Sequence, residues 1–103
     1  MTVRFARPMH PGEILRAEYL IPLGMSAGKL AKALDLPRTR IERIVREEIG
    51  ISTDTALRLG RFFSTTPNFW LNLQQAYEVE TEGARLAEEI GQIAPYAPAD
   101  RAA

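Results

Sequence analysis

The side chains best suited to chemistry in this chain are basic and hydroxyl groups gathered between Ser26 and Arg46. Arg38, Thr39 and Arg43 fall near the start of the second of two short helices that this stretch predicts. An arginine guanidinium can donate two hydrogen bonds to O6 and N7 of guanine, and a threonine hydroxyl can contact a base edge. We therefore expect Arg38, Thr39 and Arg43 to read base edges in DNA.

Further cations surround these side chains and suit DNA phosphates, which fix the position of a protein on the duplex without carrying sequence information. The candidates for such backbone contacts are Lys29, Lys32, Arg40 and Arg46. Carboxylates also follow the arginines at the four-residue spacing of solvated helices, as in the pairs Arg38–Glu42 and Arg43–Glu47. The pattern alone supports DNA reading and a merely solvated surface about equally.

Two short helices joined by a tight turn must position these groups. Apolar residues recur at the spacing of one helical face in 27–34 and again in 37–45. Between the two stretches, Asp35 tolerates a left-handed backbone, Leu36 precedes a proline, and Pro37 suits the first position of a new helix. Helices joined this closely form a helix-turn-helix, whose second helix enters the DNA major groove.

Composition excludes most kinds of catalysis. The chain of 103 residues has no cysteine and one histidine, His10, which leaves almost no material for thiol chemistry or a transition-metal site. A lone histidine before a helix start is far more often a cap or a surface group than a ligand or a base. No glycine-rich phosphate loop is present, and no Ser/His/Asp or Cys/His set can be assembled. We therefore expect no enzyme, no cofactor and no metal.

Charge is balanced over the whole chain but not along it. The 13 basic and 13 acidic residues cancel. Residues 26–61 carry eight basic and five acidic side chains, a balance of +3, whereas residues 78–103 carry two and six, a balance of −4. This asymmetry predicts a DNA-facing body and an acidic segment with another task. No apolar run approaches the roughly 20 residues of a membrane span, and no signal peptide is recognisable, so we expect a cytoplasmic protein.

Three further helices complete the body. They are expected from His10-Pro11-Gly12-Glu13 to Pro22, from Thr53 to about Phe63, and from Pro67 to about Tyr77. The last of them should bury Phe69, Leu73, Ala76 and Tyr77, with Trp70 beside that stripe. Leu71 then lies outside the stripe, and we place it, together with Leu57, at a contact between two copies of the chain.

After Tyr77 the sequence becomes acidic, and we place a boundary there. Residues 1–77 are expected to form a helix-turn-helix DNA-binding domain, and residues 78–103 an acidic C-terminal helical extension. Within the extension we expect a weaker helix from about Glu82 to Ile93. That helix either covers the body or a second copy, or binds another protein.

Four stretches together resemble one protein family. They are His10 to Leu15 (HPGEIL), Leu30 to Leu34 (LAKAL), Asp54 to Leu59 (DTALRL) and Phe69 to Gln74 (FWLNLQ). In this order and at these separations they are similar to the HigA-type antitoxins, helix-turn-helix proteins of the Xre (Cro/lambda-repressor-like) kind. Each motif is weak alone, whereas the four in order are specific. The likeness runs from about Arg7 to Tyr77.

The resemblance implies an all-α fold, a five-helix lambda-repressor-like DNA-binding domain with an additional C-terminal helical segment. It implies a homodimer that binds double-stranded operator DNA, represses its own operon and neutralises a HigB-type toxin, an mRNA-cleaving ribonuclease. The family's recognition helix corresponds to 37–45, which assigns the DNA contacts to Arg38, Thr39 and Arg43. A toxin that cleaves RNA should present a basic surface, which an acidic partner would match. The candidate toxin contacts are Val79, Glu82, Leu86, Glu89 and Ile90.

Two positions depart from the family pattern. Asp35 stands in the turn where members usually have glycine, and Arg46-Glu47-Glu48-Ile49 stands where they usually have Asn-Gly-Lys-Arg. The two carboxylates replace groups that would lie near phosphate, which should weaken DNA binding. Two alternatives stay open: a stand-alone helix-turn-helix transcriptional regulator without a toxin, and a protein-interaction module that has lost DNA binding.

Overall fold

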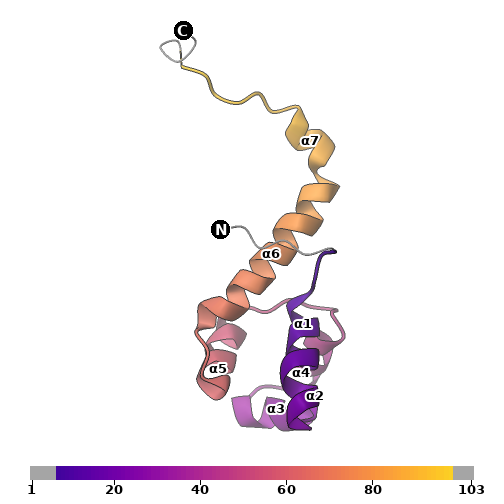
Figure 1. Ribbon diagram of the computed structural model, residues 1–103, viewed down its shortest axis with the longest axis vertical. Coiled ribbons are helices and arrows are strands. Elements are labelled where there is room, and N and C mark those ends of the chain that lie inside the picture. The colour runs from indigo at the N-terminus through magenta and orange to yellow at the C-terminus, as the bar shows by residue number, and fades with distance from the viewer. Residues whose placement is uncertain (1–6, 99–103) are drawn as a thin grey trace.

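The computed structural model describes residues 7–98, and every regular element in that part of the chain is helical (Figure 1). The first helix is irregular and runs without interruption through α1 (Pro11–Ile14), the π-helix η1 (Leu15–Leu20) and α2 (Ile21–Leu23). It is followed by α3 (Ala27–Leu34), α4 (Arg38–Val45), α5 (Thr53–Phe63), α6 (Pro67–Arg85) and α7 (Ala87–Gly91). The all-α class, with a five-helix body and a C-terminal helical segment, is confirmed.

The hydrophobic core lies where the first helix, α3, α4, α5 and the start of α6 meet. Each of these helices contributes a fully buried side chain, and the five are Leu15, Leu30, Ile41, Leu59 and Trp70. Burying a side chain of this size stabilises a fold by roughly 1.5–3 kcal/mol. The core therefore packs α3 and α4, the two helices of the predicted helix-turn-helix, against the three other helices.

The motif that opens the first helix ties it to α4 and to α6. His10 is the N-cap, and its Nδ1 accepts a hydrogen bond from the backbone N–H of Gly12 at 2.9 Å. A Cβ atom at Gly12 would lie 1.8 Å from the carbonyl oxygen of Ile44, so only glycine permits this close approach to α4. The His10 ring also packs edge-on against Tyr77 of α6, with ring centroids 4.9 Å apart. His10 was expected to be a cap or a surface group, and the structure shows it as a cap that is buried.

The inner face of α6 differs from the one expected. Trp70 lies at its centre, fully buried, and its indole N–H donates to the Thr65 hydroxyl at 2.9 Å. Phe69, expected within the stripe, is 37% exposed, and Leu71, expected outside it, is half-buried and packs against the core. Trp70 takes the deepest position because it buries the most apolar area while its N–H still finds a partner. The expectation that Leu71 stands outside the core was therefore wrong.

α6 is also longer than expected. It continues past Tyr77 to Arg85, where we expected one helix to end and another to begin near Glu82. Glutamate and alanine are strong helix formers, and the single glycine of this stretch, Gly83, costs too little to interrupt a helix already under way. The boundary expected after Tyr77 consequently falls inside a helix. In Figure 1 the second half of α6 and α7 extend away from the body, in a molecule about 60 Å long.

Candidate nucleic-acid interface

α3 and α4 form the turn that the sequence predicted. Asp35 adopts the left-handed conformation expected of it, with φ 58° and ψ 48°, and ends α3. Pro37 is the N-cap residue of α4 rather than its first helical residue, because its ψ of 138° still belongs to the extended turn. α4 therefore begins at Arg38, the first of the residues expected to read DNA.

Two arginines from other elements hold the carboxyl ends of these helices. Arg58 of α5 donates from Nη1 to the carbonyl of Leu34, the last residue of α3, at 2.8 Å. Arg16 of η1 donates to the carbonyl of Val45, the last residue of α4, and its Nη2 lies 3.4 Å from a carboxylate oxygen of Glu47. Each guanidinium satisfies a carbonyl that the helix itself leaves without a partner, and its charge suits the negative end of the helix dipole. Arg16 and Arg58 thus fix the position of the motif.

Neither of these positioning residues is predicted by the sequence pattern. Each arginine binds a carbonyl 24 or 29 residues away along the chain. No local pattern reports a contact over that separation. The nearest signal is that each arginine directly precedes or follows an apolar residue of its helix.

The exposed face of α4 carries the three side chains expected to read bases. Arg38, Thr39 and Arg43 are exposed. On the opposite side of the helix, Ile41 and Ile44 are fully buried. The structure therefore brings the three predicted residues together on one free surface, backed by the core.

The residues expected to contact phosphate fall into two groups. Lys29 and Lys32 are exposed on α3, and neither has an ion-pair partner among the described residues. Arg40 is half-buried, and its Nη1 lies 3.2 Å from Oδ2 of Asp54 in α5. Arg46 is exposed at the end of α4. The two lysines are the cations most free to meet a phosphate, whereas Arg40 also ties α4 to α5.

Carboxylates already engage the arginines of this face. Arg38 Nε donates to Glu42 Oε2 at 2.7 Å. The two carboxylate oxygens of Glu48 lie 3.4 Å from Nε of Arg43 and from Nε of Arg46. Exposed ion pairs of this kind contribute at most about 1 kcal/mol, so DNA groups can displace them.

Glu47 does not form the helical pair with Arg43 that its spacing predicted. Its backbone is left-handed, with φ 63°, and its carboxylate turns toward Arg16 instead. Glu48 takes its place beside Arg43, and its backbone N–H donates to the Arg43 carbonyl at 2.8 Å. The ion pairing around Arg43 thus depends on the backbone conformation of the residues that follow α4.

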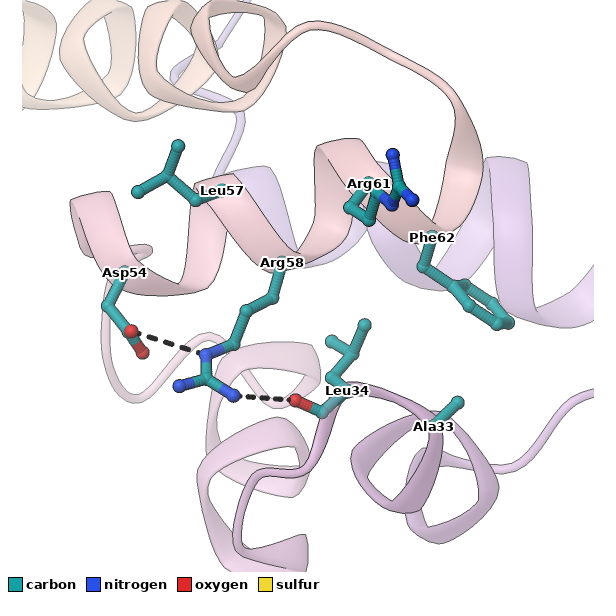
Figure 2. Close-up of a pocket in the computed structure, with 7 residues that line it drawn as sticks. All are labelled: Ala33, Leu34, Asp54, Leu57, Arg58, Arg61 and Phe62. Atoms are coloured by element: carbon teal, nitrogen blue, oxygen red, sulfur yellow. Dashed lines mark hydrogen bonds and ion pairs between the residues drawn. The ribbon is translucent and has the colours of Figure 1, made fainter.

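Leu57, one of the two residues expected at a contact between copies, lies on the outer face of α5. It is 54% exposed and lines an open groove of about 380 Å³ between α3 and α5 (Figure 2). Leu71 lies on α6 and is half-buried against the core. Of the two, Leu57 offers the larger free apolar surface.

The residues expected at a toxin contact lie along the second half of α6 and α7. Val79 and Ile90 are 66% and 51% exposed, and Leu86, between the two helices, is half-buried. Glu89 is exposed. The carboxylate of Glu82 accepts a hydrogen bond from Arg85 Nε at 2.7 Å, and this bond lowers the pKa of Glu82. Apolar and acidic side chains therefore alternate along this segment.

Other kinds of site find little support in the described part of the chain. Within residues 7–98, no three or more His, Cys, Asp and Glu side chains gather in a way that could hold a metal ion. None of the helices described there is both long enough and apolar enough to cross a membrane. Three surfaces could support a function: the exposed face of α4, the groove beside α5 and the acidic segment.

Comparison with known proteins identifies the family. No protein-family model matches the chain. It is 57% identical over 72 residues to virulence-associated protein I of Dichelobacter nodosus, a match that spans 70% of this chain and 67% of that protein. The structure of the Pseudomonas aeruginosa antitoxin HigA with the higBA promoter matches at 46% identity with a TM-score of 0.86, over 88% of this chain and all of that one. Antitoxin GraA in complex with its operator matches at 41% identity with a TM-score of 0.84, over 95% and 100% of the two chains. The chain therefore belongs to the HigA-type antitoxins, helix-turn-helix proteins of the Xre (Cro/lambda-repressor-like) kind.

Proposed function

We propose that this protein binds double-stranded operator DNA through α4, represses its own operon, and neutralises a HigB-type ribonuclease toxin. The observation that carries the DNA-binding part is the exposed row of Arg38, Thr39 and Arg43 on a helix whose other face is fully buried. The HigA and GraA structures with promoter and operator DNA support the same role. In this role the protein acts in the cytoplasm and is not an enzyme.

In this proposal α3 and α4 together contact both bases and phosphates. Arg38, Thr39 and Arg43 read base edges in the major groove, while Lys29, Lys32, Arg40 and Arg46 bind the phosphates on either side. The Arg40–Asp54 pair supports α4 from α5 until a phosphate competes for the guanidinium. Glu48 opposes binding, because its carboxylate sits between two of these arginines.

A binding titration tests this proposal directly. The DNA upstream of the gene is labelled and titrated with protein at several salt concentrations, and a scrambled duplex is titrated in parallel. Specific binding should exceed binding to the scrambled duplex by at least about 10³-fold, and both affinities should fall as salt rises. Equal affinity for the two duplexes would contradict operator recognition.

The repressor acts as a homodimer in this proposal. A two-fold dimer places two copies of α4 about 34 Å apart, one helical turn along the same side of the duplex. Leu57 and Leu71 are the residues we assign to the contact between copies. The larger exposed area of Leu57 makes it the stronger of the two assignments.

The acidic C-terminal segment is the proposed toxin-binding surface. An enzyme that binds RNA must present cations to a polyanion, and the balance of −4 over residues 78–103 is complementary to such a surface. Val79, Leu86 and Ile90 would supply the buried apolar contact, and Glu82 and Glu89 the charged rim. In functional terms, residues 1–77 then serve DNA and residues 78–103 serve the toxin, although one helix, α6, joins them.

A stand-alone regulator is the second candidate function. It shares the DNA-binding face and lacks only the toxin. Co-purification with the product of the neighbouring reading frame separates the two. A small basic ribonuclease held in a complex at or below micromolar dissociation constant supports the antitoxin, whereas operator binding with no such partner supports the stand-alone regulator.

A further inference from the structure

Arg38, the first residue of α4, has a carboxylate of its own among the described residues. Its Nε donates to Oε2 of Glu42, one turn further along the helix, at 2.7 Å. Arg43 is arranged more loosely, because its Nε lies 3.4 Å from Glu48, and the same carboxylate lies 3.4 Å from Arg46. Of these two arginines, Arg38 is therefore the one whose direction is fixed by a close contact.

The Arg38–Glu42 pair does little for the stability of α4. A cation in the first turn lies at the positive end of the helix dipole, which disfavours it. The arginine precedes the glutamate by four residues, and this order is the less stabilising of the two. The Arg38 side chain is also 73% exposed, and exposed pairs add little to the free energy of unfolding. What the pair does instead is to fix the position of the guanidinium.

α3 lies beside the aliphatic part of the same side chain. A Cβ atom at Gly28 would lie 3.4 Å from Cδ and 3.6 Å from Nε of Arg38. Glycine leaves this space to the arginine, whereas a long side chain would compete for it. The neighbouring backbone of α3 and the bond to Glu42 together restrict the directions that the Arg38 side chain can take.

The Glu42 bond leaves the end of the guanidinium free. Within residues 7–98, no acceptor is hydrogen-bonded to Nη1 or Nη2 of Arg38. These two nitrogens form a fork that can donate to O6 and N7 of guanine while Nε stays bound to the carboxylate. Base reading by Arg38 therefore does not require the pair with Glu42 to break.

We propose that Glu42 is a specificity-determining positioning residue, which orients Arg38 toward a guanine before DNA is bound. A mobile arginine loses rotamer entropy when it becomes ordered in an interface, and an arginine that is already ordered loses less. This advantage exists only on a duplex that presents guanine at the matching position. On other duplexes the held guanidinium is less free to turn to a phosphate, and the carboxylate repels the backbone. Glu42 thus increases preference for the operator and lowers affinity for DNA in general.

This inference rests on the proposed binding of operator DNA through α4, and two variants of the full-length chain test it. Glu42→Met and Glu42→Gln both remove the negative charge and keep a good helix former of similar length, but only glutamine keeps an oxygen that can accept from Arg38 Nε. Each is titrated with operator duplex, with duplexes in which single guanines are replaced, and with a scrambled duplex. Both variants should bind the scrambled duplex more tightly than the natural protein, and by a similar factor.

The two variants should differ in how well they discriminate guanine. Glu42→Met should lose about three- to tenfold of the preference for guanine at one position of each half-site, the position at which Arg38→Ala loses it. Glu42→Gln should lose clearly less there. Adding Glu42→Met to Arg38→Ala should cause no further loss, because the two residues act through one contact.

Glu48→Gln is the matched control, since it removes a carboxylate from the same face without a contact to Arg38. It should raise affinity for every duplex and leave the preference at the Arg38 position unchanged. Nitrogen relaxation of the Arg38 Nε–H group in NMR spectra of the free protein gives a readout without DNA. That group should be ordered in the natural protein and mobile in Glu42→Met, while circular dichroism melts report whether both Glu42 variants fold.

The outcomes separate this role from the proposed function. If Glu42→Met keeps its guanine preference where Arg38→Ala loses it, or only gains affinity equally for all duplexes, Glu42 is not a positioning residue and the proposed function stands. Equal losses in Glu42→Gln and Glu42→Met would assign the effect to charge and would also overturn the positioning role. If Arg38→Ala keeps the full operator preference, Arg38 does not read a base, and this part of the proposed reading face fails together with the inference.

Discussion

At the scale of single residues, Arg43 is the side chain whose assignment to base reading is most open to test. Its guanidinium is exposed, and its Nε lies 3.4 Å from a Glu48 carboxylate oxygen. Arg43→Ala should weaken operator binding by about 1–3 kcal/mol and relax sequence preference at one position of each half-site. Competition titrations with operator and single-base variants measure both effects.

Lys29→Ala is the matched control for that experiment. Lys29 is exposed on α3 and would meet a phosphate, so its loss should weaken all duplexes about equally and lower the salt slope by about one. An Arg43→Ala protein with unchanged discrimination between operator and variant duplexes would show that the reading face has been assigned wrongly.

Glu47 is a residue at which stability and DNA binding should improve together. Its φ of 63° costs a residue with a side chain roughly 1–2 kcal/mol, whereas glycine there would cost roughly 0.5–1 kcal/mol of extra chain entropy. Glu47→Gly should therefore raise the free energy of unfolding by about 0.5 kcal/mol, even though the exposed pair with Arg16 is lost. It should also raise DNA affinity by removing a carboxylate near phosphate. Denaturant unfolding and operator titration measure the two effects.

Glu48→Gln separates the two contributions at this loop. Glu48 does not have the left-handed backbone of Glu47, but its carboxylate engages Arg43 and Arg46. The substitution should raise DNA affinity and leave the free energy of unfolding nearly unchanged. A gain in stability as large as that of Glu47→Gly would contradict the backbone explanation.

His10 should make the stability of the fold depend on pH. Burial lowers the pKa of His10, while the negative charge of Glu47 and a hydrogen bond to the Ile49 backbone act in the opposite direction. The folded state therefore favours the neutral ring, which accepts the Gly12 N–H at 2.9 Å. This stabilisation is complete above the unfolded-state pKa of about 6.5 and is lost as the pH falls from there to the lower folded-state pKa.

Thermal melts between pH 7.5 and pH 5 measure this effect. His10→Asn keeps a side chain that can cap α1 but does not titrate, so its stability should vary less over this range than that of the natural protein. Identical pH dependence in the two proteins would show that His10 is not the responsible group.

At the scale of elements, α7 and the second half of α6 are the part of the fold with the fewest ties to the core. The deepest side chain of α6 is Trp70, and α7 contributes no buried residue. Truncation after Arg85 leaves α6 whole and removes α7 together with Glu89 and Ile90. We expect the melting temperature and operator affinity to stay nearly unchanged, and affinity for the toxin to fall by at least about tenfold, since a buried apolar anchor and its charged rim are lost.

A shorter truncation, after Ala94, keeps α7 and serves as the control for that experiment. Isothermal titration with the purified toxin compares the two truncated proteins with the full chain. If removing α7 lowers the melting temperature and leaves toxin affinity intact, the segment is architectural, and the toxin must bind the body.

At the scale of the whole molecule, the proposed dimer makes a prediction about the operator. Two copies of α4 about 34 Å apart match half-sites 10–10.5 base pairs apart, centre to centre. Inserting five base pairs between the half-sites turns one of them to the opposite side of the duplex. Affinity should then fall by about 10²-fold or more, because only one half-site can be engaged at a time. Titration of the two duplexes measures this loss, and equal affinity would argue for binding as independent monomers.

The sequence by itself determined the parts of this protein that depend on neighbours along the chain. The apolar spacing in 27–34 and 37–45 was sufficient to predict α3 and α4, and the same spacing placed Arg38, Thr39 and Arg43 on the outer side. Asp35 was sufficient to predict the left-handed end of α3, because that preference belongs to the residue itself. Helix periodicity and turn preferences act over a few residues, and a single sequence displays them directly.

Only the tertiary structure decided the features that depend on competition between distant groups. Trp70 displaced Phe69 from the centre of α6 because side chains from several helices compete for one core. Arg16 and Arg58 became caps for helices 24 or more residues away, and Glu48 rather than Glu47 paired with Arg43. In each case the outcome depends on which group reaches a buried or charged position in space. The local sequence does not report which group that is.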